Sequence, residues 1–202
     1  MTPRFIARQL SCPSGLLGRI TGRLMNRRNA RMNEFAVKQL ELQPADRVLE
    51  IGFGGGVTLS TLIAVAASVT GVDRSQDAVN LANARFSAAV KAGRAQFRVG
   101  VVESLPFDSG HFTKACTVNT VYFWKSLDQA FAEIFRVLAP QGRVAIGFLS
   151  KQSMDQLRMP SDIFTSRTPE EVRAALVGAG FRGVRTERPE PATSWNVMVA
   201  VR

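Results

Sequence analysis

The chain has 202 residues, of which 46% are hydrophobic and 21% are charged, and this balance excludes a mostly disordered or collagen-like protein. Its two cysteines, Cys12 and Cys116, lie far apart with no histidine at ligand spacing, which excludes a disulfide framework and a metal site of the zinc type. The formal net charge is +10, and residues 1–45 hold eight of the 26 basic residues against two of the 16 acidic ones, so the basic character is strongest at the N-terminus.

A basic amphipathic helix is expected near the N-terminus. Leu17, Ile20 and Leu24 recur at helical spacing, which predicts one apolar face. Such a helix could hold an anionic group of a substrate, make a peripheral contact with a membrane, or serve only solubility, and these alternatives stay open. Another face of this helix carries a line of arginines, Arg19, Arg23 and Arg27.

The helix breaker Pro44 marks a boundary between two parts of the chain. A second helical pattern, from about residue 29 to 40, precedes it. We therefore predict an N-terminal basic helical lid at residues 1–44 and a main domain at residues 45–202. Charged residues interrupt the first apolar positions, so no secretory signal is expected and the protein is expected to be cytoplasmic.

Short apolar runs alternate with helical patterns after this boundary. This βαβα alternation predicts a parallel sheet with helices on both faces. The predicted strands are 47–51, 68–72, 95–100, 112–118 and 143–149, and the predicted helices between them are 57–66, 75–92 and 127–138.

The end of the chain follows a different pattern. Thr168 and Pro169 predict a helix start, and this helix should run to about residue 179. Two further strands, 181–187 and 195–201, are separated by a link too short for a helix, so we expect them to pair antiparallel. The predicted fold is a Rossmann-like sheet of seven strands, mostly parallel, with an antiparallel C-terminal pair.

Ligands of an open parallel sheet lie beyond the carboxyl ends of its strands. After the first strand, Gly52, Gly54 and Gly56 would let the backbone turn tightly and approach a ligand closely, and Glu50 suits a ligand that brings hydrogen-bond donors or positive charge. Asp73 follows Gly54 by 19 residues, a spacing typical of carboxylates that bind ribose hydroxyls. The alternative is a turn aspartate that only caps the next helix.

A dinucleotide is disfavoured as the ligand. The G-x-G-x-x-G pattern that starts at Gly52 would need a third glycine at position 57, which is Val57. The same pattern started at Gly54 would need its third glycine at position 59, which is Leu59.

Three segments, taken together and in order, resemble class I S-adenosylmethionine-dependent methyltransferases, in particular the small-molecule group that includes ubiquinone and menaquinone biosynthesis enzymes. They are VLEIGFGGG at 48–56, ESLPF at 103–107 and RVLAPQG at 136–142. The resemblance covers residues 44–202 and implies S-adenosylmethionine as cofactor, with methyl transfer to a small-molecule acceptor.

The resemblance also implies roles for individual residues. The glycines would pass beneath the methionine moiety, Glu50 would lie near its amino group or brace the loop, Asp73 would hold the ribose, and Arg74 would lie along the adenine. The family often has an acid after Gly100 for the adenine amino group, but here that position is Val101, which leaves backbone atoms or Glu103 as substitutes. The implied cofactor-binding residues are Glu50, Gly52, Gly54, Gly56, Asp73, Arg74, Val102, Glu103 and Asn119.

The loop after the fourth strand is where we expect the methyl group and the acceptor to be aligned. Asn119, Tyr122 and Trp124 are the candidate catalytic residues there, because aromatic faces can pack beside a sulfonium and a flat acceptor. An aromatic cluster that only packs the core is the alternative. The sole histidine, His111, precedes the fourth strand and would lie at the wrong edge of the sheet.

The acceptor is expected to be anionic or apolar, and to reach a pocket lined by the segment 151–166. No proton acceptor other than Tyr122 is apparent in the loop 119–124, which favours an acceptor that needs no base. Two other functions stay open at this point. One is a non-catalytic S-adenosylmethionine-binding regulatory module, and the other is a nucleic-acid methyltransferase, which is disfavoured because residues 119–122 do not have the Asn-Pro-Pro-aromatic pattern. The sequence gives no prediction of the oligomeric state.

Overall fold

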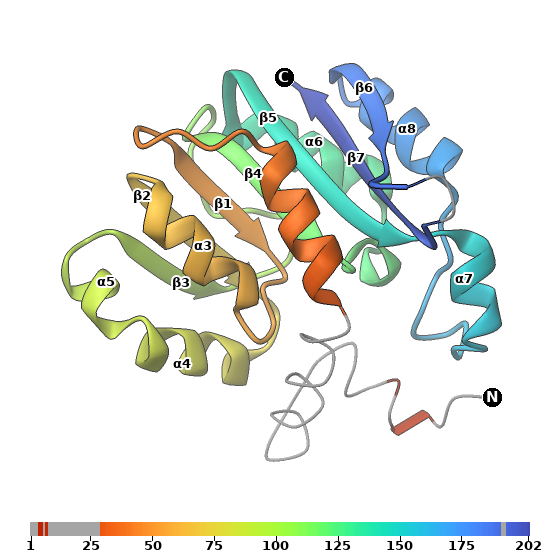
Figure 1. Ribbon diagram of the computed structural model, residues 1–202, viewed down its shortest axis with the longest axis horizontal. Coiled ribbons are helices and arrows are strands. Elements are labelled where there is room, and N and C mark those ends of the chain that lie inside the picture. Colours follow the sequence, from red (N-terminus) through yellow and green to blue (C-terminus); the bar gives the residue numbers. More distant parts are fainter. Residues whose placement is uncertain (1–3, 6, 8–28, 191–192) are drawn as a thin grey trace.

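A seven-stranded sheet forms the centre of the computed structural model, which describes residues 4, 5, 7, 29–190 and 193–202 (Figure 1). The order of the strands is β3-β2-β1-β4-β5-β7-β6. The strands of this described region are β1 (Arg47–Ile51), β2 (Ser68–Asp73), β3 (Ala95–Val99), β4 (Phe112–Val118), β5 (Leu138–Leu149), β6 (Arg182–Glu187) and β7 (Trp195–Val201).

The pairing of the strands confirms the predicted fold class. Strands β1 to β5 pair in parallel, whereas β7 pairs antiparallel with both β5 and β6. The carboxyl ends of β1, β2 and β4 therefore meet at one edge of the sheet, and the antiparallel C-terminal pair extends the sheet beyond β5.

Helices cover both faces of the sheet, as the alternating pattern predicted (Figure 1). The helix at residues 29–39, α3 and α4 pack on one face, and α6 and α8 pack on the other. The labelled helices are α3 (Val57–Val65), α4 (Gln76–Arg85), α5 (Ser87–Lys91), α6 (Leu127–Val137), α7 (Lys151–Gln156) and α8 (Pro169–Gly178), with a 3-10 turn η1 at Val121–Phe123.

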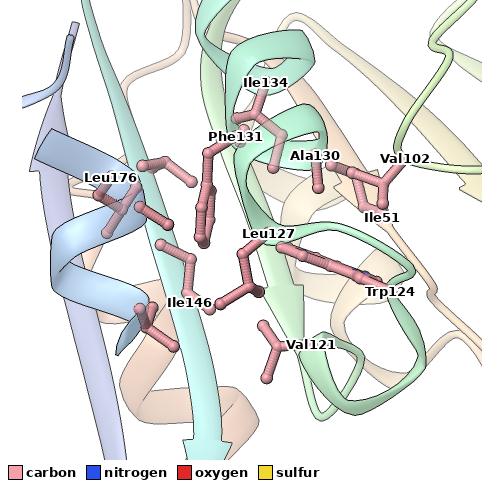
Figure 2. Close-up of a cluster of buried hydrophobic side chains, with 14 of the residues drawn as sticks. Ile51, Val102, Val121, Trp124, Leu127, Ala130, Phe131, Ile134, Ile146 and Leu176 are labelled. Carbon is pink, nitrogen blue, oxygen red and sulfur yellow. The ribbon is translucent and has the colours of Figure 1, made fainter. Parts of the chain in front are cut away.

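Helix α6 shows how the sequence pattern builds one of these faces. Ser126 caps its start by accepting a hydrogen bond from the N–H of Gln129 at 3.2 Å, and its apolar residues recur at helical spacing and are buried. Figure 2 shows Phe131 and Ile134 of this helix pointing into the cluster that also holds Leu176 of α8. Truncating a fully buried side chain such as Phe131 to alanine costs about 3 to 5 kcal/mol. The Phe131 ring also packs against Trp124 of the loop that precedes α6, so the helix holds this loop in place.

Two elements differ from the prediction by more than one residue at a boundary. The predicted helix 75–92 is divided at Phe86 into α4 and α5, because the Phe86 ring packs 5.9 Å from that of Phe97 on β3. Strand β5 begins at Leu138, before the predicted break, because its pairing with β4 continues through a register shift and Gln141 adopts a left-handed φ of 63°.

The predicted lid region lies partly within the described residues. The helix at 29–39 packs into the same core as β1, β5 and β7, and the side chains of Met32, Ala36 and Leu40 are at most 2% exposed. The amphipathic helix with its line of arginines lies outside the described residues, so its proposed membrane contact stays a prediction. Of the helices in the described part of the chain, none is long and apolar enough to cross a membrane.

Candidate functional site

A cavity of about 480 Å³ opens at the carboxyl ends of the central strands, a volume within the range of small-molecule sites, about 300 to 1,000 Å³. It brings together the candidate residues from four separate loops. Of the candidates named from the sequence, those that line it are Glu50, Gly52, Gly54, Asp73, Arg74, Val102, Glu103, Asn119, Tyr122 and Trp124.

The glycine loop between β1 and α3 has a left-handed backbone at each predicted glycine. A Cβ atom on Gly52 would clash with Cγ2 of Thr120, whereas a Cβ on Gly54 would meet no atom within 4 Å. Gly52 therefore lets the loop pack closely on Thr120, and Gly54 leaves its side of the cavity open. Gly56 does not line the cavity; it is the N-cap of α3, where a Cβ would lie 3.1 Å from Leu59.

Asp73 ends β2 at the cavity wall and is 7% exposed. Its Oδ2 accepts a hydrogen bond from the N–H of Gly54 at 2.8 Å, and its Oδ1 accepts one from the N–H of Ser75 at 2.8 Å. Burial raises the pKa of this carboxyl, and the two backbone hydrogen bonds oppose the rise. A carboxylate accepts about four hydrogen bonds, so each oxygen of Asp73 keeps capacity for a ligand hydroxyl.

The alternative role of Asp73 as a turn aspartate is therefore also present in the structure, through its bond to Ser75. The helix cap itself is made by Ser75, whose Oγ accepts from the N–H of Ala78 at 3.2 Å. The Asp73 side chain braces both adjoining loops and still faces the cavity.

Glu50 lies at the floor of the cavity and is 4% exposed. Thr58 donates a hydrogen bond to its Oε1, while Oε2 is buried without a hydrogen-bond partner among the described residues. Burial raises the pKa of this carboxyl from 4.5 to about 7; the Thr58 hydrogen bond lowers it and the nearby Asp73 raises it further. An unpartnered buried carboxylate oxygen is costly, and a ligand that brings a positively charged amino group would relieve that cost.

The β3 end of the cavity has an aromatic and cationic wall. The Arg74 guanidinium carbon lies 5.1 Å from the centre of the Phe123 ring. This contact links the end of β2 to the loop after β4. The Glu103 carboxylate accepts a hydrogen bond from the N–H of Lys125 at 2.7 Å. Val101 is 50% exposed and lines the cavity beside them.

The loop after β4 places two of the candidate catalytic residues in contact. Asn119 has a left-handed φ of 59°, and its Oδ1 accepts a hydrogen bond from the Tyr122 hydroxyl at 3.2 Å. The same hydroxyl accepts a hydrogen bond from the N–H of Leu149, and burial raises the pKa of Tyr122. Tyr122 is thus engaged as both donor and acceptor, which makes it a poor general base.

The third candidate in this loop, Trp124, is 6% exposed. Its ring packs edge-on against Phe131 at 5.3 Å between centres, and Figure 2 shows both side chains in the same buried cluster. Trp124 therefore packs the core, as the alternative predicted, and also contributes to the cavity wall.

Most of the described residues that line the β5 side of the cavity are apolar. The segment 151–166, part of which forms α7, contributes much of the wall, and the Phe164 ring lies 4.7 Å from that of Phe123. Of the five Met, Leu, Ile and Phe residues in this segment, Ile163 alone does not line the cavity. The others, which do line it, are Met154, Leu157, Met159 and Phe164.

Several lining residues were missed by the sequence analysis. Thr58 and Thr120 carry no motif signal, because their importance comes from contacts with Glu50 and Gly52. Met32 and Trp195 reach the cavity from opposite ends of the chain, because the 29–39 helix and β7 both pack beside β5. His111 does not line the cavity, and its ring lies 4.7 Å from that of Phe112.

Comparison with known proteins agrees with this geometry. Residues 49–146 match the family model described as a methyltransferase domain. The chain is 29% identical over 129 residues to the uncharacterized methyltransferase YdaC of Bacillus subtilis, covering 63% of this chain and 69% of that protein. It is 24% identical over 181 residues to the ubiquinone/menaquinone biosynthesis C-methyltransferase UbiE of Geotalea daltonii, covering 75% and 77%.

A solved structure shares the fold. It is an N-methyltransferase of Haemonchus contortus, determined with S-adenosylhomocysteine, with a TM-score of 0.71, 18% identity, and coverage of 85% of this chain and 52% of that one. Neither alternative function, the binding module or the nucleic-acid methyltransferase, gains support from these comparisons.

The cavity residues fit the cofactor of such enzymes. Glu50 offers a buried oxygen for an amino group, Asp73 keeps acceptor capacity for ribose hydroxyls, and Gly54 leaves open space between them. The matched domain, the relatives and the seven-stranded sheet together support a class I S-adenosylmethionine-dependent methyltransferase.

Proposed function

We propose that the chain methylates a small, predominantly apolar acceptor that binds in the β5 half of the cavity. The observation that carries this proposal is the division of charge along the cavity wall. Its charged lining residues lie at the β1–β3 end or beside it, whereas the described residues at the β5 end are uncharged. The charged lining residues are Glu50, Asp73, Arg74, Glu103 and Lys125.

Apolar and aromatic groups supply the binding energy at the β5 end. Phe164 packs edge to face on Phe123, the ring that lies between this half and Arg74. Met154 and Met159 are flexible side chains that adapt to the shape of a ligand. A charged acceptor would lose its hydration in this half without finding an ion partner among the described residues. An apolar acceptor would instead gain about 25 cal/mol for each Å² of apolar surface that it buries.

The cofactor supplies a methyl group that is already activated by a sulfonium charge, so the protein has little covalent chemistry to perform. Its residues have to align the acceptor with the methyl carbon and exclude water. Tyr122 holds Asn119 in place through its hydroxyl, and the buried Trp124 keeps the loop packed on α6. Because Tyr122 is a poor base, the proposed acceptor carries a nucleophile that reacts without a protein base.

A labelled-methyl transfer assay tests this proposal. The purified chain is incubated with methyl-labelled S-adenosylmethionine and with cell-extract metabolites separated into apolar, neutral polar and anionic pools. We expect label in the apolar pool, and none with an Asp73→Ala variant. Label only in the anionic pool would contradict the proposed acceptor class, and S-adenosylhomocysteine binding without transfer to any pool would favour the regulatory module.

A matched pair of variants at the apolar wall sharpens the assay. Met159→Lys places a charge in the β5 half, whereas Met159→Leu keeps the wall apolar with nearly the same volume. We expect Met159→Lys to reduce transfer to the apolar acceptor at least about tenfold while S-adenosylhomocysteine binding is retained. Equal transfer by both variants would place the acceptor elsewhere.

A further inference from the structure

Val101 lies at the β3 end of the cavity, where the nucleobase of the cofactor would bind. Its side chain cannot form hydrogen bonds. Strand β3 is the neighbour of β2 on the side away from β1. With the ribose at Asp73 and the amino acid part of the cofactor at the glycine loop after β1, the base extends toward the end of β3. Residues 100–103 line the cavity there.

The groups around this position offer few hydrogen-bond acceptors. The side chain of Val101 is 50% exposed and that of Val102 is 4% exposed, and neither can accept a hydrogen bond. The Val101 carbonyl already accepts from the N–H of Ser104 at 3.3 Å. The Glu103 carboxylate, two residues further along, is tied to the loop after β4, because its Oε1 accepts from the N–H of Lys125 at 2.7 Å. Its other oxygen keeps acceptor capacity, so the test below has to show whether the 6-amino group reaches it.

Flat and apolar surfaces are abundant at the same place. The Arg74 guanidinium lies over the Phe123 ring, and planar guanidinium groups also stack on aromatic bases. The two valines add apolar area on which a purine ring can pack. The environment therefore suits the face of a purine better than the amino group on its edge.

We propose that this chain binds the purine of its cofactor through stacking and apolar contact, with no side chain of the described residues accepting a hydrogen bond from the 6-amino group. This inference rests on the proposed function, because it concerns the cofactor of that reaction. Affinity for the cofactor is then nearly independent of the 6-amino group, and Val101 is the residue that sets this tolerance.

Calorimetric titration with two ligands tests the proposal without an acceptor. The ligands are S-adenosylhomocysteine and its analogue with hydrogen in place of the 6-amino group, which keeps the ring nitrogens unchanged. For the wild-type chain we expect the two Kd values to agree within about threefold, because a neutral, solvent-facing group contributes little. A loss of about tenfold or more with the analogue would overturn the proposal, because it would reveal a hydrogen-bond acceptor for the amino group.

Two variants complete the experiment. Val101→Asp supplies a carboxylate, and we expect it to prefer S-adenosylhomocysteine over the analogue by at least about tenfold through a charge-assisted hydrogen bond. Val101→Ala is the matched control and should keep the wild-type ratio. An unchanged ratio in a folded Val101→Asp variant would mean that the base lies elsewhere, which would also overturn the proposal.

These outcomes are separable from the failure of the proposed function. If the wild-type chain binds neither ligand, cofactor binding itself is contradicted. If Val101→Asp does not melt cooperatively, the wild-type comparison of the two ligands decides the proposal alone.

Discussion

Asp73 accepts a hydrogen bond from the N–H of Gly54 at 2.8 Å, which ties the end of β2 to the glycine loop after β1. The second oxygen of Asp73 accepts from the N–H of Ser75 at 2.8 Å. The carboxylate proposed to hold the ribose is therefore also the brace of the loop that approaches the cofactor. A change at Asp73 should be visible both in stability and in binding.

Asp73→Asn is expected to lower the stability of the unliganded protein. The amide places an NH₂ group where one carboxylate oxygen accepted from a backbone N–H, so one buried donor loses its partner at a cost of about 1 to 3 kcal/mol. Thermal melting should show this as a decrease of several degrees in Tm. The exposed Asp108→Asn serves as the control, and equal Tm values for the two variants would argue against the bracing role.

The two glycines that line the cavity should respond differently to alanine. Gly54→Ala has room for its Cβ, so it should cost only about 1 to 2 kcal/mol for its left-handed backbone while weakening S-adenosylhomocysteine binding. Gly52→Ala should be the less stable variant, because its Cβ clashes with Cγ2 of Thr120. Urea unfolding measures both.

The clash at Gly52 has its own control. Thr120→Ser removes the Cγ2 methyl group and keeps the hydroxyl that contacts Thr117. The double variant Gly52→Ala/Thr120→Ser should recover part of the lost stability. Strictly additive losses would show that the clash is not the cause.

Glu50 should make stability depend on pH. Its folded-state pKa of about 7 lies above the ordinary value of 4.5, so the folded chain binds more protons than the unfolded chain between these values. Its contribution to stability is therefore lost as pH rises from 4.5 to 7, by on the order of 3 kcal/mol. The free energy of unfolding is measured for the wild type and Glu50→Gln at several pH values. The difference between the two proteins should grow from pH 4.5 to 7 and stay constant above pH 7.

The same carboxyl should couple ligand binding to pH. If Glu50 receives the positively charged amino group of the ligand, binding favours its ionised form. S-adenosylhomocysteine affinity should then rise between pH 6 and 8 in the wild type and should rise less in Glu50→Gln. If the wild type and Glu50→Gln show the same dependence of affinity on pH in calorimetry, Glu50 does not bind the amino group.

Tyr122→Phe should behave as a positioning variant. Loss of the hydroxyl leaves the N–H of Leu149 and Oδ1 of Asn119 without their partner, so stability should fall by about 1 to 3 kcal/mol. Methyl transfer should decrease without a change in the shape of its pH profile. Disappearance of one limb of that profile would instead identify Tyr122 as a proton acceptor.

The sequence predicted those parts of the fold that depend on local patterns. Strands 47–51, 112–118 and 195–201 were predicted with the observed bounds, because apolar runs end there at turn residues. The break at Phe86 was missed because helical periodicity continues across it, and its cause is a contact with a distant strand. The short helix α7 gives too little periodicity to be recognised.

Some residues of the candidate site could likewise be predicted from the sequence, and others could not. Asp73 and the glycines were found because their spacing carries a signal, and Glu50 was found because it is a carboxylate at the end of the first strand. The sequence carries no signal for three other lining residues, because tertiary contacts alone bring them to the cavity. They are Thr58, Thr120 and Trp195. Gly56 had the right spacing, but it lies at the N-cap of α3, outside the cavity lining.

Calorimetric titration of the wild-type chain and Asp73→Ala with S-adenosylhomocysteine tests the central claim most directly. The wild type should bind one ligand per chain, and Asp73→Ala should bind it more than about tenfold more weakly, because two charge-assisted hydrogen bonds to the ribose are lost. No binding by the wild type, or equal Kd values for a folded Asp73→Ala variant, would contradict the assignment of this cavity.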